Sequence, residues 1–262
     1  MARGREREVE VALVVCAPEP GSVADEVAEL ADIAGYALEP GPDQQIHDQY
    51  FDFDDGRLGD RGLAFRVRNI DGRDVLTVKG PGRRMTTGAK DRLEVEGDWS
   101  LSVLGHALHL LAGFGVDVPV DVAPAGPPQP RPALERLGFL IVQDRHTLRR
   151  PRRVTRVGGS GDVLAELAID AVEYELPRRN ARLFEVEVET TRLAGSLVLA
   201  ELASALLTRW PDQLRRWPHS KLATGFALDA LAAPSSLGTL TDRDGVLKPA
   251  AWERLEERLG PF

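Results

Sequence analysis

Hydrophobic and ionisable residues alternate along six segments of this chain. Strict alternation of this kind predicts β-strands, because successive side chains of a strand point to opposite faces. Each segment would therefore have one apolar face, with residues such as Val9, Val11 and Leu13, and one charged face. The charged faces carry Glu6, Glu8 and Glu10; Arg66 and Arg68; Lys79; Arg92, Glu94 and Glu96; Glu166 and Asp170; and Glu185, Glu187 and Glu189.

The ordinary interpretation of this alternation is an antiparallel sheet with its apolar face on a core and its charged face in water. Two features favour another interpretation. Several charged faces are almost purely acidic or purely basic, and acidic and basic segments alternate along the chain. We therefore expect the sheet to close into a barrel with an ionic interior. Arg and Lys there would suit a polyphosphate, and clustered carboxylates would suit a hard divalent cation such as Mg²⁺ or Mn²⁺.

Helical periodicity and end signals predict helices between the strands. Helices are expected at 20–36, 101–115, 134–139, 193–209 and 249–258. Strands are expected at about 46–53, 62–70, 73–80, 91–99, 139–149, 152–157, 163–174 and 182–190, and a last strand or turn would carry Lys221. Residues 117–133 are rich in Pro and Ala and read as a loop between two halves. Residues 231–262 form a polar C-terminal extension, expected to contain one helix.

Composition excludes several classes of protein. The chain has 262 residues, is 43% hydrophobic and carries a net charge of −8, which argues against nucleic-acid binding through bulk electrostatics. The single cysteine, Cys16, precludes an internal disulfide and a thiol-based zinc site. No segment is long and apolar enough to predict a membrane span. We expect a cytoplasmic protein without nucleic-acid or membrane partners, and a homodimer is compatible with the sequence.

Other motifs point less clearly to chemistry. His106 and His109 lie three apart in a predicted helix without a nearby acid or cysteine, which favours exposed helix residues over metal ligands. The chain lacks the P-loop pattern of nucleotide hydrolases. The basic run from Arg145 to Arg156 is consistent with a solvated face, but alternate positions could also place one or two guanidiniums in the interior.

Several stretches follow one another in an order that is typical of a known family. They are Glu8-Val9-Glu10, Gln49-Tyr50-Phe51-Asp52-Phe53, Arg57-Leu58, Gly62-Leu63-Ala64-Phe65-Arg66-Val67-Arg68, Leu76-Thr77-Val78-Lys79-Gly80, Arg92-Leu93-Glu94-Val95-Glu96, Leu164-Ala165-Glu166-Leu167-Ala168-Ile169-Asp170, Phe184-Glu185-Val186-Glu187-Val188-Glu189 and Ser220-Lys221-Leu222-Ala223-Thr224-Gly225. Together, over roughly residues 5–228, they resemble the CYTH domain, or triphosphate tunnel metalloenzymes. That family includes inorganic and thiamine triphosphatases, class IV adenylyl cyclases and RNA triphosphatases.

The resemblance implies an α+β fold: a closed antiparallel eight-stranded β-barrel over residues 1–230, forming a triphosphate tunnel with helices packed outside. It also implies metal-dependent hydrolysis of a triphosphate-containing small molecule, with Mg²⁺ or Mn²⁺ as cofactor. The implied substrate-binding residues, with Arg145 placed inward by its family position, are Arg66, Arg68, Lys79, Arg92, Arg145 and Lys221. The implied metal ligands are Glu8, Glu10, Asp170, Glu185 and Glu187. The implied catalytic residues are Glu94, Glu96 and Lys79.

One position departs from the family pattern. The N-terminal signature ends in Lys, and this chain has Ala12 there. Either another base such as Arg7 or Lys90 compensates, or the substrate preference has changed, or the protein binds without turnover. Two alternatives to hydrolysis therefore remain, a class IV-type adenylyl cyclase and a catalytically weak phosphate- or nucleotide-binding protein.

Overall fold

One antiparallel sheet of twelve strands runs through the molecule. The computed structural model describes residues 3–81, 83–84, 90–118, 129–190, 196–232 and 237–260, and the side chains of these residues except 3–8, 83–84, 90–93 and 237. The strands are β1 (Arg3–Val15), β2 (Asp32–Ile33), β3 (Tyr36–Pro40), β4 (Gln44–Asp52), β5 (Ala64–Ile70), β6 (Arg73–Lys79), β7 (Arg83–Arg84), β8 (Lys90–Asp98), β9 (Leu140–Arg156), β10 (Ala165–Glu175), β11 (Ala181–Thr190) and β12 (Leu214–Arg216).

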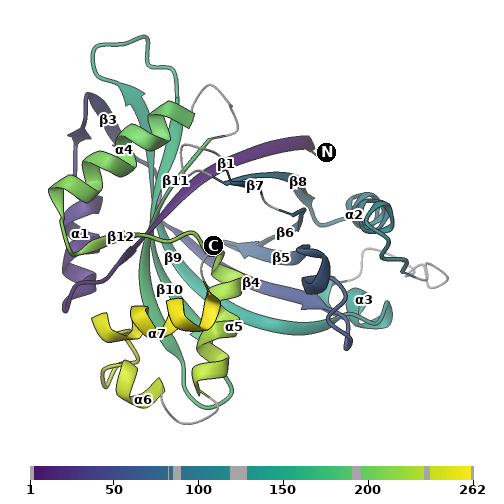
Figure 1. Cartoon of the computed structure of the whole chain (residues 1–262). Helices are drawn as coiled ribbons and strands as arrows, with labels where there is room; N and C mark the ends of the chain where they lie inside the picture. The colour runs from purple at the N-terminus through teal and green to yellow at the C-terminus, as the bar shows by residue number, and fades with distance from the viewer. Residues whose placement is uncertain are drawn as a thin grey trace.

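The helices lie in separate groups on both sides of this sheet (Figure 1). They are α1 (Pro20–Ala28), α2 (Leu101–Gly113), α3 (Pro130–Arg136), α4 (Ser196–Arg209), α5 (Lys221–Ala232), α6 (Leu237–Leu240) and α7 (Pro249–Leu259), with a short 3₁₀ turn at Gly59–Arg61. Helices α1 and α4 pack on β1, β10 and β11, whereas α2 and α3 pack on β4, β5 and β6. None of the described helices has both the length and the hydropathy of a membrane span.

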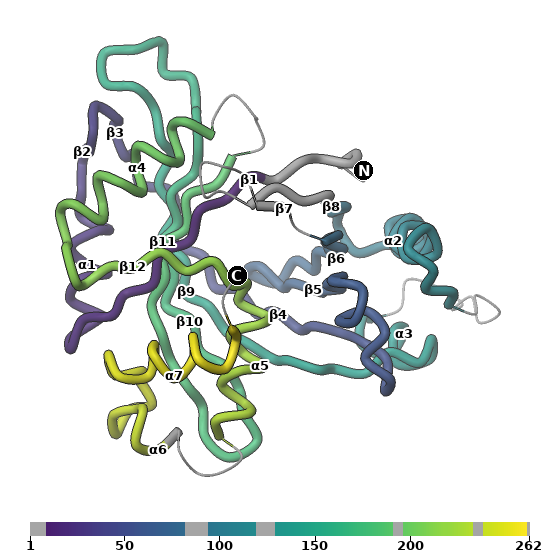
Figure 2. Tube along the Cα trace, viewed as in Figure 1, coloured from purple at the N-terminus to yellow at the C-terminus, as the bar shows by residue number. Residues whose placement is uncertain are grey.

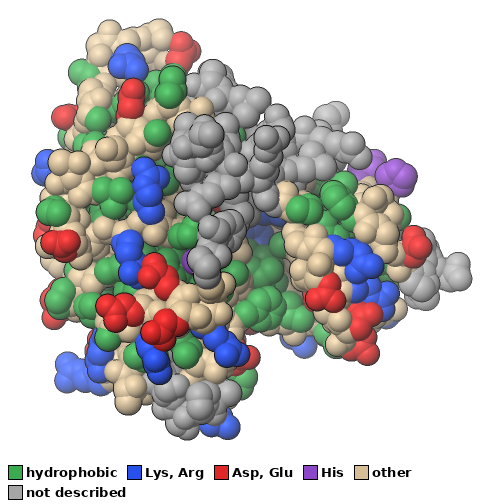
Figure 3. All heavy atoms as spheres, viewed as in Figure 1, with side chains coloured by type: hydrophobic (Ala, Val, Ile, Leu, Met, Phe, Trp, Pro, Cys, Tyr) green, Lys and Arg blue, Asp and Glu red, His purple; other side chains and the backbone are tan. Residues whose placement is uncertain are grey.

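A third apolar cluster holds the C-terminal helices in place. Trp252 of α7 is 1% exposed, and its ring lies 5.1 Å from that of Trp217, edge to face. Leu228 of α5 belongs to the same cluster. The outer side of α7 is polar, and its acidic and basic side chains are interspersed on the surface (Figure 3). Helices α6 and α7 thus pack on the part of the chain that precedes them.

The expected closed eight-stranded barrel is wrong. The strands follow the order β10-β11-β1-β8-β6-β5-β4-β9-β3-β2, with β12 added on β1 and β7 on β8, and β9 also pairs with β10. A closed barrel has no edge strands, whereas this sheet ends on β2, which pairs only with β3 among the described strands. The curved sheet therefore keeps edges, as the trace shows (Figure 2). The α+β composition agrees with expectation.

Three local predictions also differ from the structure. The first helix ends at Ala28 rather than at 36, because the chain turns there into β2 and β3. The two strands expected at 139–149 and 152–157 are one strand, β9. Pro151 is tolerated within it because it lies where the pairing with β4 stops and the pairing with β3 starts, so that its missing N–H removes no required bond. Lys221 begins helix α5 instead of a strand or turn.

Candidate active site on the charged face of the sheet

The charged residues of neighbouring strands share one face of the sheet, because residues paired directly across two strands point to the same side. The pairs are Lys79–Glu94, Thr77–Glu96, Arg66–Thr77, Tyr50–Arg66, Asp48–Arg68, Asp48–Arg145, Arg149–Asp170 and Asp170–Glu185. The intervening apolar residues, such as Phe65, Val67 and Ile169, face the helices. The predicted division into an apolar and a charged face is thus confirmed.

Asp48 is the centre of a buried cluster of bases. Its carboxylate accepts two hydrogen bonds from Arg68, at 2.7 and 2.9 Å, and one from Nη2 of Arg145 at 2.7 Å. Nε of Arg66 lies 3.6 Å from the same carboxylate. Burial alone would raise the pKa of Asp48, but the three guanidiniums outweigh it and hold this pKa well below its ordinary value. Three bases therefore surround one acid where water is largely excluded.

Tyr50 adds an ionisable hydroxyl to this cluster. Nη2 of Arg145 donates a hydrogen bond to its oxygen at 3.0 Å, and the guanidinium carbon of Arg145 lies 5.0 Å from the ring centre. Burial favours the neutral phenol, yet Arg145 and Arg66 lower the pKa of Tyr50 to about 8. The positive potential of the cluster thus outweighs the effect of burial and favours ionisation of Tyr50 at a lower pH than is usual for tyrosine.

Two of the predicted catalytic acids lie beside the cluster on β8. Arg66 donates a hydrogen bond to Thr77 at 3.1 Å, and the Thr77 hydroxyl donates to Glu96 at 3.2 Å. Nζ of Lys79 lies 3.4 Å from Glu94. The strand pairing of β5, β6 and β8 therefore connects these acids to the bases of the cluster.

Three carboxylates meet around the ammonium group of one lysine further along the same face. Nζ of Lys221 lies 3.2 Å from Asp170 and 2.7 Å from Glu185, and it also contacts Glu187. Arg149 donates hydrogen bonds to Asp170 at 2.7 and 2.8 Å and to Glu187 at 2.8 Å. We call Asp170, Glu185 and Glu187 the carboxylate cluster.

Burial sets the electrostatics of the carboxylate cluster. Asp170 and Glu185 are 0% and 1% exposed. Burial, together with the neighbouring acids, raises the pKa of Glu185 above its ordinary value. For Lys221, burial acts to lower the pKa, but the three carboxylates outweigh it and raise this pKa. The three carboxylates therefore strongly favour a positive charge at the position of this ammonium group.

Helix α5 delivers Lys221 to this position by approaching the sheet closely. Gly225 lies one helical turn after Lys221, on the same side of the helix. A Cβ atom on Gly225 would stand 2.0 Å from the amide nitrogen of Gln143 and 2.8 Å from the ring of Tyr174. The helix can therefore seat its first turn on the charged face only because this residue has no side chain.

Tyr174 and Gln143 join the base cluster to the carboxylate cluster. The guanidinium of Arg145 lies 5.7 Å from the ring centre of Tyr174, whose hydroxyl donates to the backbone carbonyl of Lys221 at 3.0 Å. Gln143 accepts a hydrogen bond from Arg145 at 3.4 Å and donates one to the carbonyl of Leu222 at 3.0 Å. The two clusters are thus parts of one continuous ionic site.

Comparison with known proteins shows the family of the chain. The sequence profile of the CYTH domain matches residues 17–207, which is most of the chain. The chain belongs to the CYTH family. No curated protein sequence matches it.

Solved structures include proteins that resemble this chain. HpAC1 of Hippeastrum, a proposed adenylyl cyclase with a dominant triphosphatase activity, has a TM-score of 0.53 and 17% identity, covering 84% of this chain and 95% of that chain. A Bacillus halodurans protein, a proposed adenylate cyclase, has a TM-score of 0.47 and 16% identity, covering 84% and 96%. PH1819 of Pyrococcus horikoshii has a TM-score of 0.47 and 19% identity, covering 82% and 96%. At these identities the likeness concerns the fold.

The structure brings most of the residues predicted for a CYTH site onto the charged face. The exceptions are Glu8 and Arg92, whose side chains lie outside the described residues, although β1 and β8 place them opposite each other. Glu10 lies on the charged face opposite Glu189. Lys221, expected among the phosphate-binding bases, contacts the carboxylate cluster in this structure.

Ala12 lies directly opposite Glu187 in the pairing of β1 with β11. The side chains of Arg7 and Lys90, suggested as substitutes for the missing signature Lys, lie outside the described residues. Glu187 itself contacts two other bases, Arg149 and Lys221. Arg149 and Lys221 thus supply positive charge close to Ala12, which stands where the family signature has a lysine.

The sequence analysis did not identify Asp48 as a site residue. It named Tyr50 only as part of a family motif. It also left undecided whether Arg149, in the basic run, points into the site or into solvent. Asp48 and Tyr50 alternate in β4, so the strand period alone would have assigned them to one face. Arg149 lies four residues after Arg145, again on the same face of one strand, which was the available signal.

Proposed function

We propose that this CYTH protein hydrolyses a triphosphate, inorganic or organic, in a reaction that requires Mg²⁺ or Mn²⁺. One observation carries the proposal: a cluster of bases around Asp48 adjoins three carboxylates that converge on one cation position. Membership of the CYTH family and the likeness in fold to HpAC1, which has a dominant triphosphatase activity, support a reaction of this class.

The bases would bind and orient the phosphate groups. Arg66, Arg68 and Arg145 carry planar guanidiniums, which match pairs of phosphate oxygens. Asp48 holds all three in place but neutralises only one of their charges, so an incoming triphosphate would complete the neutralisation. The other bases proposed to bind phosphate are Lys79, Arg92 and Lys221.

The carboxylate cluster fits a hard divalent cation because it offers several oxygen ligands and no softer ones. In this structure the ammonium of Lys221 stands at the point where the three carboxylates meet, which marks it as a cation position. Glu8 and Glu10 on the adjacent β1 are proposed as further ligands. A bound Mg²⁺ or Mn²⁺ would neutralise phosphate charge and polarise the phosphoryl group.

Glu94 and Glu96 are proposed to orient the attacking water, with Lys79 next to Glu94. Phosphoryl transfer needs little covalent chemistry from the protein, so positioning and charge neutralisation would provide most of the rate. The burial of Arg66, Arg145 and Asp170 supports charge neutralisation as a source of rate, because charges act more strongly where water is excluded.

Ala12 supports a second candidate function, which is binding with little turnover. Loss of a base from the charged face would weaken turnover more than binding if that base acts mainly on the charge that develops during the reaction. The protein would then bind a phosphate compound or a nucleotide with little catalysis. A cyclase is a further alternative, in which a ribose hydroxyl replaces water and attacks the α-phosphate.

A substrate panel with separate detection of two products tests the proposal. Purified protein is incubated with tripolyphosphate, ATP or thiamine triphosphate in the presence of Mg²⁺ or Mn²⁺, and orthophosphate and pyrophosphate are measured. We expect orthophosphate from at least one substrate and its loss on addition of a chelator. Release of pyrophosphate from ATP alone would contradict hydrolysis and support the cyclase alternative. Thermal stabilisation by a substrate without any product would support the binding alternative.

A further inference from the structure

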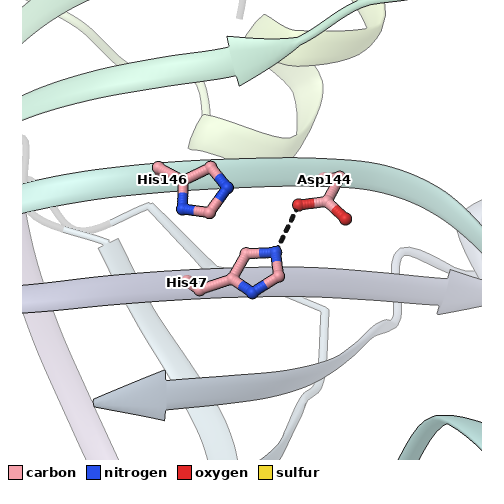
Figure 4. Close-up of side chains that lie close together, drawn as sticks. All are labelled: His47, Asp144 and His146. Carbon is pink, nitrogen blue, oxygen red and sulfur yellow. Dashed lines mark hydrogen bonds and ion pairs between the residues drawn. The ribbon is translucent and has the colours of Figure 1, made fainter. Parts of the chain in front are cut away.

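A second group of potential metal ligands lies on the opposite face of β4 and β9, away from the ionic site. His47 and His146 pair directly across these strands, and each adjoins a residue of the charged face, Asp48 or Arg145. Their imidazole rings stack with centres 4.3 Å apart and planes 10° from parallel. Asp144 lies two residues before His146 on β9, and its Oδ1 is 2.5 Å from Nε2 of His47 (Figure 4).

The donor atoms of these three residues are close enough to share one ion. One ring nitrogen of each histidine and one oxygen of Asp144 all lie within 4.8 Å of one another. Metal bonds of about 2.0–2.2 Å in a tetrahedral site would place the ligand atoms about 3.5 Å apart. Modest side-chain rotations would therefore complete the geometry without movement of the paired strands.

Two neighbouring groups support the cluster. Gln49 donates a hydrogen bond to the other oxygen of Asp144 at 2.9 Å, which leaves Oδ1 directed at His47. Oε1 of Glu175, on the adjacent strand β10, lies 3.0 Å from Nε2 of His146. Gln49 thus fixes the orientation of Asp144, and Glu175 fixes that of His146.

An ion could reach this position from solvent. The side chains of His47 and His146 are 36% and 51% exposed. Both histidines line an open pocket of about 410 Å³, whose other walls include Gln45, Asn69 and Leu148. The pocket supplies an entry path and room for a water ligand.

We propose that His47, Asp144 and His146, with Glu175, form a binding site for a divalent transition metal of the Zn²⁺ type. Two imidazoles and a carboxylate are a donor set that favours Zn²⁺ and its first-row neighbours over Mg²⁺. The carboxylate cluster on the charged face has only oxygen ligands and so the opposite preference. The two faces of one sheet would thereby separate a structural or regulatory metal from the catalytic one.

Co²⁺ is a suitable probe, because its visible absorption reports both binding and coordination by nitrogen in a tetrahedral site. Full-length protein freed of metal with a chelator is titrated with Co²⁺, and Zn²⁺ is then added. We expect one equivalent of Co²⁺ to give the tetrahedral spectrum and Zn²⁺ to displace it. The H47Q/H146Q double variant should lose this spectrum, and D144N should weaken Co²⁺ binding by about 10-fold or more.

The control is the H106Q/H109Q double variant, which removes two exposed histidines of α2 that lie three residues apart. It should retain the Co²⁺ spectrum, and so should E187Q, which alters the carboxylate cluster. Circular dichroism and thermal melting establish that each variant is folded. Retention of the spectrum in folded H47Q/H146Q, its loss in E187Q, or absence of a tetrahedral spectrum in the native protein would overturn the proposal.

Discussion

The carboxylate of Asp48 and the guanidinium of Arg145 lie 2.7 Å apart in the interior, although the two residues are separated by 97 positions in the sequence. Asp48 is 0% exposed and Arg145 is 1% exposed. A buried ion pair is costly to break, because the remaining partner keeps its charge without compensation. Asp48 is therefore both the anchor of the base cluster and a sensitive point for stability.

Replacing Asp48 by Asn should destabilise the protein by about 3 kcal/mol or more, since three guanidiniums lose their buried counter-charge. The free energy of unfolding, measured with a chemical denaturant, tests this. The matched control is D98N, which breaks an exposed pair with Arg73 at 3.6 Å. It should change stability by less than about 0.5 kcal/mol. Equal losses in both variants would contradict the central role of Asp48.

The same residue should make stability depend on pH in the acid range. Its pKa is lower in the folded protein than in the unfolded chain, where it is about 3.9. Below that pH the unfolded chain binds more protons, so stability falls as the pH decreases towards the folded-state pKa. Stability measured between roughly pH 5 and pH 2 should therefore fall more steeply in the native protein than in D48N. Parallel curves would show that Asp48 does not titrate in this way.

Tyr50 should be distinguishable from the other tyrosines by titration. The chain has three tyrosines. The pKa of Tyr50 is lowered to about 8, whereas burial raises the pKa values of Tyr36 and Tyr174. Ultraviolet absorbance of tyrosinate should show one early step that Y50F removes and Y36F keeps. A bound triphosphate should shift this step to higher pH, because its charge offsets that of Arg145 and Arg66.

Two Gly→Ala substitutions in helices should have opposite effects. G225A places a methyl group against Gln143 and Tyr174, so we expect a loss of about 1–3 kcal/mol. G105A adds a methyl group on α2 where no atom lies within 4 Å, so we expect a gain of about 0.5–1 kcal/mol. The free energy of unfolding of both variants, measured with a denaturant, tests whether α5 packs closely on the charged face. A gain of stability in G225A would contradict it.

The sequence was sufficient to assign residues to faces because the period of a strand is local. Alternation alone placed Arg66, Asp170 and Glu185 on the charged face of their own strands, and the strand pairing puts Asp170 and Glu185 on one face. The same alternation carried no information about strands of two residues, such as β2 and β7, which are too short to show a period. These short strands help to make the sheet differ from the closed eight-stranded barrel that the family resemblance implied.

The connections within the site could not be read from local patterns. Asp48 is one of two acids in β4, and its importance comes from bases that reach it from β5 and β9. Long-range contacts of this kind determine which charged residues act together. The start of α5 at Lys221 was also missed, although Ser220 accepts a hydrogen bond from the N–H of Ala223 at 3.2 Å and so forms a local N-cap.

The central claim is that the carboxylate cluster supports metal-dependent hydrolysis on the charged face. The most direct measurement is the rate of Mn²⁺-dependent orthophosphate release, with the most active substrate of the panel, for the native protein, E187Q and E173Q. Glu173 lies on β10 three residues from Asp170, on the opposite face, where it pairs with Arg182. We predict that E173Q retains the native rate and that folded E187Q loses it by roughly 100-fold or more. Full activity in E187Q would contradict the proposed metal site.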